Sequence, residues 1–478
     1  MAKPQAAGWR ELFVPRYAVS LLVITLAVML HAADATLIAT LSPAIVRDIG
    51  GIHLLGWTSS LYELGSITAA AASGLLSLRM GLRKSMSIAA LVFAAGCAIS
   101  AVAGSMNGLL LGRLAQGIGG GGMVALSFVA VTVVFPERLM PRALAVVSTV
   151  WGLSAFLGPL IGGLMVEHAS WRWGFSLFAL LAVLLSVWNL LGVAQRDQAE
   201  VAESPFPLWR LLWLAAGVVC ISSSGVVVHS LYTPLWLIAG LVCLSVFFAL
   251  DKKRENSRLF PKEAMSLRDP VGAALIMIMS FAMATIAISL YGPLLLTELH
   301  GLSELEAGYV IACSAIGWSV AAVLVSGMPV RRDRLMILCG MLALTISVFG
   351  LVVVMSRGPV WLIAGIAVIE GAGFGMAWAF ILRRCNSLVL EGDRERIASA
   401  IATLHRLGYA LGAAIIGLVA NASGLRVAEG GEQSETLVVT GAQSAAYWVF
   451  VGSIPFALVG LYAMVNFLRP RAGVENTR

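Results

Sequence analysis

Residues 17–41, Tyr17–Leu41, read YAVSLLVITLAVMLHAADATLIATL. This run is long enough to cross a bilayer as a helix, which takes about 20 mostly apolar residues. It nevertheless contains Asp34. A charged carboxylate at the centre of a bilayer costs about 2.5–3.5 kcal/mol on insertion scales, unless it faces protein or water. The segment therefore predicts a membrane helix whose acid has a partner or a function.

The composition extends this interpretation to the whole chain. Of 478 residues, 59% are hydrophobic and 12% are charged, with a mean hydropathy of +0.91; soluble domains are about 25% charged. The chain is therefore predicted to be a polytopic membrane protein. The net charge of +7 is expected from basic cytoplasmic loops. Nucleic-acid binding is not expected, because no soluble basic module is present.

Apolar runs separated by charged or Pro/Gly-rich loops give fourteen candidate spans. They run over 17–41, 54–77, 86–104, 108–135, 142–167, 173–193, 209–229, 231–250, 270–297, 304–328, 335–355, 359–382, 396–421 and 445–468. The pair 209–229 and 231–250 is separated only by His229 and Ser230, so a re-entrant hairpin, and hence twelve full spans, is the alternative.

The distribution of Lys and Arg predicts the orientation. The expected outer loops contain only four of these residues: Arg47, Arg172, Arg357 and Arg426. Such a bias predicts an even number of spans with both termini in the cytoplasm. The predicted organisation is a cytoplasmic N-terminus (1–16), a six-helix bundle (17–193), an inserted helix pair with a cytoplasmic linker (194–269), a second six-helix bundle (270–468) and a cytoplasmic C-terminus (469–478).

Three glycine-containing motifs stand out. The first, GLLSLRMGLRK over 74–84, has Gly74 and Gly81 for close helix approach and a tight turn, and Arg79 and Arg83 as basic loop residues. The second, RLAQGIGGGG over 113–122, suits close contact between membrane helices. It does not fit a phosphate loop, because no strand precedes it and no GK[ST] follows it.

The third motif lies in the fifth predicted span and is SAFLGPLIGG over 154–163. It contains Gly158, Pro159, Gly162 and Gly163, and the outer sequence Trp-Arg-Trp follows at 171–173. Proline removes a backbone hydrogen bond and kinks a helix, so we expect a bent, closely packed segment.

These motifs together resemble the major facilitator superfamily, and within it the fourteen-helix drug:proton antiporter branch. The loop at 74–84 is similar to the family motif GxLaDrxGrr, residues 113–120 to RxxQGxGxG, and residues 154–163 to the antiporter motif GxxxGPxxGG. Asp34 with Pro43 resembles the acid of helix one. The resemblance implies an all-α major facilitator fold, an exporter driven by the proton gradient with no other cofactor, and a substrate site between the halves.

The chain departs from the family pattern in four places. Leu78 replaces the acid of the loop motif and Leu82 replaces its later arginine, while Ser154 replaces the first glycine of the helix-five motif. The equivalent loop of the second half, 327–334, retains little beyond basic charge. These changes leave the fold expectation intact but put the details of gating in question.

Five charged residues lie inside the predicted spans: Asp34, Glu63, Glu370, Arg113 and Arg406. At 1.5 Å per residue, the first-half residues lie roughly 8–14 Å from the outer face, and the second-half pair lies roughly 15–16 Å deep. Three acids and two arginines leave one carboxylate without a fixed cation, as proton exchange requires. Buried ion pairs that only fix helix packing are the alternative.

The leading hypothesis makes Asp34 the main proton or substrate carboxylate, with Glu63 or Glu370 as the second acid and Arg113 and Arg406 as charge partners. If Arg113 keeps Asp34 ionised, proton exchange passes to Glu63 or Glu370. His31 lies one turn before Asp34, and His405 precedes Arg406. Either suits a proton relay, although packing roles are expected.

The predicted function is export of lipophilic, cationic drugs or toxic compounds across a bacterial inner membrane, by a monomer. Export of an endogenous metabolite, siderophore or organic anion is the alternative, since two intramembrane arginines suit an anion; a receptor that has lost transport is a third. An enzyme is not expected, because no nucleophile–base pair, metal-ligand cluster or nucleotide motif is present. The six cysteines form no CxxC or Cys/His cluster, so neither a disulfide framework nor a metal site is expected.

Overall fold

The computed structural model describes residues 9–50, 54–192, 206–226, 232–254, 257–302, 304–429 and 437–469. Almost all of this chain is helical. The helices of the first half are η1 (Trp9–Phe13), α1 (Pro15–Ile49), α2 (Leu55–Met80), α3 (Leu82–Ala101), α4 (Met106–Val134), α5 (Met140–His168) and α6 (Trp171–Gly192). Two helices follow: α7 (Leu208–Val226) and α8 (Tyr232–Lys252).

The second half repeats the pattern. Its elements are α9 (Pro270–His300), α10 (Glu304–Val325), η3 (Val330–Arg332), α11 (Asp333–Val354), α12 (Val360–Ser387), η4 (Glu391–Asp393), α13 (Arg394–Ala422), α14 (Ala442–Val451) and α15 (Ile454–Leu468). A short antiparallel hairpin of β1 (Arg426–Glu429) and β2 (Leu437–Thr440) precedes α14 and pairs Arg426 with Thr440.

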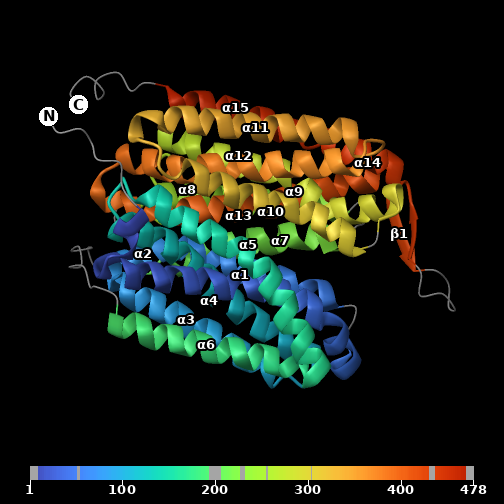
Figure 1. The fold of residues 1–478 in the computed structure, drawn as a ribbon, viewed down its shortest axis with the longest axis horizontal. Helices are drawn as coiled ribbons and strands as arrows, with labels where there is room; N and C mark the ends of the chain where they lie inside the picture. Colours follow the sequence, from blue (N-terminus) through green and yellow to red (C-terminus); the bar gives the residue numbers. More distant parts are fainter. Residues whose placement is uncertain are drawn as a thin grey trace.

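The helices lie in two groups, α1–α6 and α9–α15, which we call the N-terminal and C-terminal groups (Figure 1). The long helices run roughly parallel to a common direction, and the described chain begins and ends at the same end of the molecule. We call this the terminal end. Helix α7 contacts both α2 and α13, so the α7–α8 pair packs along the junction of the two groups.

Glycines set the closest helix contacts in each group. A Cβ atom on Gly117 or Gly121 of α4 would overlap the backbone of α2 at Tyr62 or Ser66. One on Gly371 or Gly375 of α12 would overlap the backbone of α10 at Ser314 or Trp318. Helices packed this closely tolerate no side chain at the contact. The predicted role of the 113–122 glycines is therefore confirmed.

The same spacing along the chain separates Gly117 from Gly371, Gly119 from Gly373 and Gly121 from Gly375. The middle glycine of each set faces a third helix: Gly119 packs on Phe93 of α3, and Gly373 packs on Gly340 and Leu344 of α11. The α2–α3–α4 and α10–α11–α12 arrangements are thus related by an internal repeat. The sequence analysis expected two similar halves, but had no residue-level alignment between them.

Twelve helices of the described chain are long and apolar enough to cross a membrane, with α14 and α15 counted together as Ala442–Leu468. Helices α5 and α7 are not among the twelve. Among the described residues, helix α7 contributes a shorter apolar stretch, Leu208–Ile221. The predicted count of fourteen spans is therefore not shown; the structure supports an all-helical membrane fold with twelve candidate spans.

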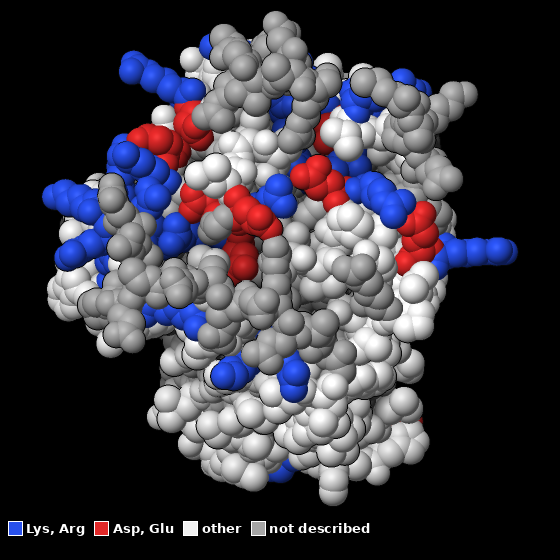
Figure 2. Space-filling model, turned by 90° about the vertical axis from the view of Figure 1, so that its left-hand side faces the viewer, with Lys and Arg blue, Asp and Glu red and all other residues white. Residues whose placement is uncertain are grey.

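Contacts between the two groups are found at the terminal end. Gly74 of α2 lies against α13, where an added Cβ would be 2.8 Å from both the Glu395 carbonyl oxygen and Ser399 Oγ. Asn386 of α12 donates to Thr132 Oγ1 of α4 over 3.4 Å. Arg394 lies 3.6 Å from Glu137 in an ion pair. Figure 2 looks onto this end, where Lys and Arg side chains gather together with Asp and Glu side chains.

Candidate functional site

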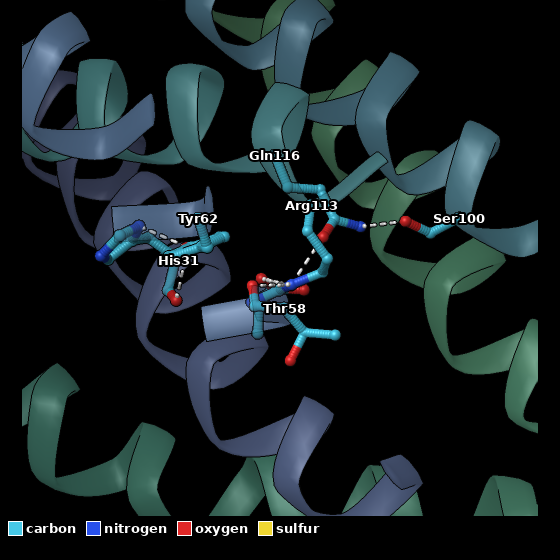
Figure 3. Close-up of polar contacts among 7 residues, drawn as sticks. His31, Thr58, Tyr62, Ser100, Arg113 and Gln116 are labelled. Carbon is cyan, nitrogen blue, oxygen red and sulfur yellow. Dashed lines mark hydrogen bonds and ion pairs between the residues drawn. The ribbon is translucent and has the colours of Figure 1, made fainter. Parts of the chain in front are cut away.

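The first cluster of intramembrane charges is built on Arg113 of α4. Arg113 Nη1 lies 2.7 Å from Asp34 Oδ2 of α1, and both side chains are buried, with exposed fractions of 1% and 0%. The same nitrogen donates to Gln116 Oε1 over 2.6 Å, and Nε donates to the Thr58 carbonyl over 3.3 Å. Figure 3 shows Arg113 extending from α4 near Thr58 and Gln116. Asp34 is thus held by a fixed cation.

The Arg113 cluster continues into polar and aromatic neighbours. Gln116 Nε2 donates to Ser100 Oγ of α3 over 3.3 Å. The Arg113 guanidinium lies over the Tyr62 ring, 4.3 Å from its centroid, in a cation–π contact. The buried cation therefore binds groups from α1, α2 and its own helix, and locks them together as hydrogen-bonded buried pairs do.

The second cluster joins the two groups of helices. Arg406 of α13 donates from Nη1 to Glu63 of α2, at 2.9 Å to Oε2 and 3.2 Å to Oε1. Its Nη2 contacts His31 Nε2 of α1. Equal depth had grouped Arg406 with Glu370 in the sequence analysis; the observed partner of Arg406 is Glu63 instead. Depth along a helix does not fix the direction of a side chain, and Arg406 faces the other group.

The third intramembrane acid, Glu370 of α12, has a different environment. Its side chain is 5% exposed, and Oε2 has no hydrogen-bond partner among the described residues. By the internal repeat, Glu370 occupies the position of Gln116, and Ala367 occupies that of Arg113. The cation that anchors the α4 position is therefore replaced by a methyl group, and Glu370 is the carboxylate that the two arginines leave unpaired.

An aromatic cluster lies one turn along α12 from Glu370, at Phe374 and Trp378. The His405 ring packs 4.9 Å from Trp378 and 4.6 Å from Tyr409, measured between ring centroids. Trp318 of α10 stacks on Phe374 and donates from Nε1 to Ser148 Oγ of α5 over 3.2 Å. His405 is therefore a packed histidine, as expected, and this cluster also spans the junction of the groups.

The loop motif and the helix-five motif take different places in the structure. Gly81 has a φ of +80° and makes the turn between α2 and α3, and Arg79 and Arg83 flank this turn. Gly158, Pro159, Gly162 and Gly163 lie within the continuous helix α5. An added Cβ on Gly162 would lie 3.0 Å from Thr40 of α1, whereas one on Gly163 would meet nothing within 4 Å. Gly162 of the helix-five motif thus packs closely against α1.

Sequence reasoning missed several members of these clusters. The polar residues Thr58 and Ser100 gave no signal, because isolated hydroxyls are common in membrane helices. It also missed the buried pair of Asp333 Oδ1 and Arg383 Nη2, which lies in the second-half loop region credited only with basic charge. A search for an acid opposite each buried arginine would have found Asp333, since an unpaired buried cation is unfavourable.

Paired charges inside apolar helices, two repeated helix groups and a polar junction between them define a polytopic membrane transporter. The sequence profile described as "Major Facilitator Superfamily" matches residues 24–413, so the chain belongs to that superfamily. It is a secondary transporter of this family and not an enzyme.

Similar proteins include efflux transporters. The chain is 29% identical over 440 residues to probable multidrug-efflux transporters from two Mycobacterium tuberculosis strains, covering 90% of this chain and 92% of theirs. It is 24% identical over 417 residues to multidrug resistance protein 3 of Bacillus subtilis, covering 82% and 78%.

Solved structures support the fold. The human organic anion transporter MFSD10 matches with a TM-score of 0.65 and 15% identity, over 94% of this chain and 99% of that one. The proton:xylose symporter XylE matches with a TM-score of 0.64 and 16% identity, over 94% of both chains.

Proposed function

We propose that this protein is a proton-coupled exporter of lipophilic cations, with Glu370 as the acid that exchanges the proton. The observation that carries the proposal is the pairing of Arg113 with Asp34 and of Arg406 with Glu63. Glu370 remains buried without a cation. In such a site the neutral acid is tolerated, while the charged form needs a counter-ion. A cationic substrate supplies one, so proton and substrate compete for the same carboxylate.

The charge of the site favours cations over organic anions as substrates. The five intramembrane groups named above carry one net negative charge when ionised. Both guanidiniums are already bonded to carboxylates, so neither is available to an anionic substrate without breaking its pair. The names of the similar multidrug-efflux transporters support efflux of several compounds and do not specify their charge. Export of an endogenous metabolite or an organic anion is the alternative.

The proposal includes the arrangement in the membrane. Helices α5 (29 residues) and α7 (19 residues) also cross, which makes fourteen spans in two six-helix domains with α7 and α8 inserted. The basic terminal end faces the cytoplasm of a bacterial cell, and the protein acts in the inner membrane as a monomer. Alternating access moves the two domains about the junction, with the loop motif and the helix-five motif as close contacts that guide this motion.

Transport assays in proteoliposomes with an imposed pH gradient test the proposal. Wild-type protein is expected to move lipophilic cations against their gradient, and organic anions are not expected to compete. The variant Glu370→Gln keeps the shape of the side chain but cannot ionise; we expect it to lose proton-driven transport while still exchanging substrate for substrate. The matched control is Glu298→Gln, which changes an exposed acid on α9. Full proton-driven transport by Glu370→Gln would refute the assignment.

A further inference from the structure

Arg142, near the start of α5 at the terminal end, is a buried cation that bonds no anion among the described residues. It is 8% exposed. The other buried arginines of the described chain, Arg113, Arg210 and Arg383, are each bonded to a carboxylate. The Arg142 guanidinium makes no hydrogen bond or ion pair to a described residue, and its Nε is enclosed without a partner. Arg142 is therefore the exception in this set.

The Arg142 guanidinium contacts an aromatic ring and a glycine. Its central carbon is 5.7 Å from the centroid of the Trp9 ring in η1. A Cβ added to Gly327, in the connection between α10 and η3, would be 3.1 Å from Arg142 Nη2. Glu11 of η1 acts on Arg142 only at longer range, because its carboxylate is bonded to Arg138 at 2.8 Å. Neither Trp9 nor Gly327 has a side-chain acceptor, so these contacts leave the guanidinium N–H groups without one.

A guanidinium in this position favours the binding of an anion. Arginine presents five N–H donors and no acceptor, and a buried charge without a counter-ion is unfavourable. The planar fork of Nη1 and Nη2 matches the oxygens of a phosphate or carboxylate group, which accept two parallel hydrogen bonds. Because Nε is enclosed by protein, an anion from outside would reach this fork.

The aromatic surface beside Arg142 favours a lipid as the source of the anion. Within η1, Leu12 is fully buried, whereas Trp9 and Phe13 are 39% and 64% exposed. Leu12 therefore anchors η1 to the protein and leaves the two aromatic side chains at the surface. Trp is enriched where membrane helices meet the headgroup layer. An exposed Trp and Phe next to a buried cation suit the boundary between headgroup and acyl chain better than they suit a soluble ion.

Exposed arginines beside the site favour a headgroup of net negative charge. Arg138 lies four residues before Arg142, and its side chain is 53% exposed. Arg331 and Arg332 of η3 follow Gly327 closely in the chain and are also exposed. Anionic lipids attract clusters of Lys and Arg at the membrane surface. A zwitterionic headgroup would bring its own cation toward these arginines.

We propose that Arg142 binds the phosphate group of an anionic membrane lipid, between α5 and the α10–η3 connection. Nη1 and Nη2 donate hydrogen bonds to two phosphate oxygens, and the acyl chains lie along the exposed aromatic side chains of η1. Because Arg142 belongs to the N-terminal group and Gly327 to the C-terminal group, the lipid lies across their junction at the terminal end. The site requires only the membrane fold, and it is independent of the transported substrate and of Glu370.

Thermal unfolding of the delipidated full-length protein in a nonionic detergent tests the proposal. A ligand that binds only the folded state raises the melting temperature with its concentration, so titrations give the affinity. The probes are phosphatidylglycerol, phosphatidylcholine and inorganic phosphate. We expect phosphatidylglycerol to raise the melting temperature of the wild-type protein at concentrations where the other two have little effect.

The variant Arg142→Gln keeps a polar side chain but removes the charge. Its affinity for phosphatidylglycerol is expected to fall about tenfold, the size of a lost hydrogen bond to a charged group. Without added lipid, Arg142→Gln should be at least as stable as the wild type, because the unpaired buried cation is gone; with lipid the order should reverse. The matched control Arg254→Gln removes an exposed arginine at the same end and should keep the wild-type affinity.

The outcomes separate a lipid site from a structural role. A loss of stability in Arg142→Gln that is the same with and without lipid would overturn the proposal. Equal stabilisation by phosphatidylcholine would overturn the requirement for an anionic headgroup, and equal stabilisation by inorganic phosphate would assign a soluble ion in place of the lipid.

A second variant decides the question if Arg142→Gln does not fold. Arg142→Lys keeps the charge but not the planar fork, so its affinity for phosphatidylglycerol should fall below that of the wild type. Wild-type affinity in this variant would contradict the two proposed hydrogen bonds. None of these results bears on proton-driven transport through Glu370, which is measured with a pH gradient.

Discussion

Helices α4 and α12 are equivalent in the internal repeat, yet α4 holds a paired cation and α12 holds an acid without a cation. Both pack glycines at the same repeat positions against a neighbouring backbone. On α4, Gln116 is one turn from Arg113, and both side chains are hydrogen-bonded to other side chains. On α12, Glu370 takes the place of Gln116, and Ala367 takes the place of Arg113. The packing of the two helices is thus conserved within the molecule, while the chemistry beside it differs.

This comparison shows that the glycine contacts and the charges are separable parts. The glycines determine how close the helices lie, and therefore the fold. The residue one turn before the first of these glycines is Arg113 on α4 and Ala367 on α12. This residue determines whether the neighbouring polar side chain has a fixed charged partner. Arg113→Ala alters the charge on α4, and Gly371→Ala alters the packing of α12.

The largest effect is expected from removing the cation of α4. Arg113→Ala makes α4 resemble α12, but it leaves Asp34 charged and buried. Breaking a buried ion pair from one side costs about 3–5 kcal/mol. We expect a matching loss in the free energy of unfolding, measured by denaturation in detergent micelles.

The control for this prediction removes both charges. Because Asp34→Asn/Arg113→Ala has no isolated charge, it should recover part of the loss. If the free energy of unfolding of Arg113→Ala lies within about 1 kcal/mol of the wild-type value, as for exposed ion pairs, then Asp34 readily becomes neutral. The two helices would then differ less than proposed.

A smaller effect is expected from the shared packing feature. A Cβ atom on Gly371 would overlap the Ser314 backbone, so Gly371→Ala forces α10 and α12 apart; overpacking of this kind costs about 1–3 kcal/mol. Gly365 on the same helix has nothing within 4 Å of an added Cβ. Gly365→Ala should be neutral, or stabilising by up to about 1 kcal/mol because alanine favours helix. Equal unfolding free energies for the two variants would argue against the close contact.

The smallest effect tests the role of burial. Asp48 and Arg172 form an ion pair beyond the apolar stretch of α1, with side chains 45% and 36% exposed. Hydrogen bonds from Arg172 and Trp171 hold the pKa of the Asp48 carboxyl below its usual range. The pKa of this carboxyl is near 4 in the unfolded protein and lower in the folded protein. The ionised carboxylate therefore stabilises the folded state at pH values above the unfolded-state pKa. This contribution is lost as the pH falls through the folded-state pKa.

Arg172→Ala should therefore lower the melting temperature slightly at pH 7, and the difference from wild type should vanish in acid. The melting temperatures of both proteins as a function of pH measure this. A difference that persists below the folded pKa would show that Arg172 acts through packing on Trp171 and not through the ion pair.

Much of the fold could be predicted from the sequence, because membrane helices are set by local composition. The spans, the two similar halves and the close contacts of residues 113–122 all followed from apolar runs and glycine spacing. The count of fourteen spans stays a prediction, because the described chain contains twelve candidate spans and α5 and α7 are not among them. The short β1–β2 hairpin was also not predicted, because each of its strands is only four residues long.

The candidate site was only partly predictable. Charge arithmetic indicated one unpaired acid among Asp34, Glu63 and Glu370, but not which. Residue depth follows from position along a helix, whereas the partner of Arg406 depends on how α13 is rotated toward α2. That rotation is fixed by packing of the whole helix. For this reason the Arg406–Glu63 contact between the groups, and with it the isolation of Glu370, required the structure.

The contact of Thr132 with Asn386 joins the two halves of the chain. These residues are separated by the same spacing as the paired glycines, so they are equivalent positions that face each other across the repeat axis. In a symmetric dimer of identical halves, such a position would contact its own copy, and every substitution would appear twice. Joining the halves in one chain removes this constraint. A carboxylate in the position of Glu370 can then occur once per molecule, with a neutral amide as its counterpart, so an odd number of exchangeable protons becomes possible.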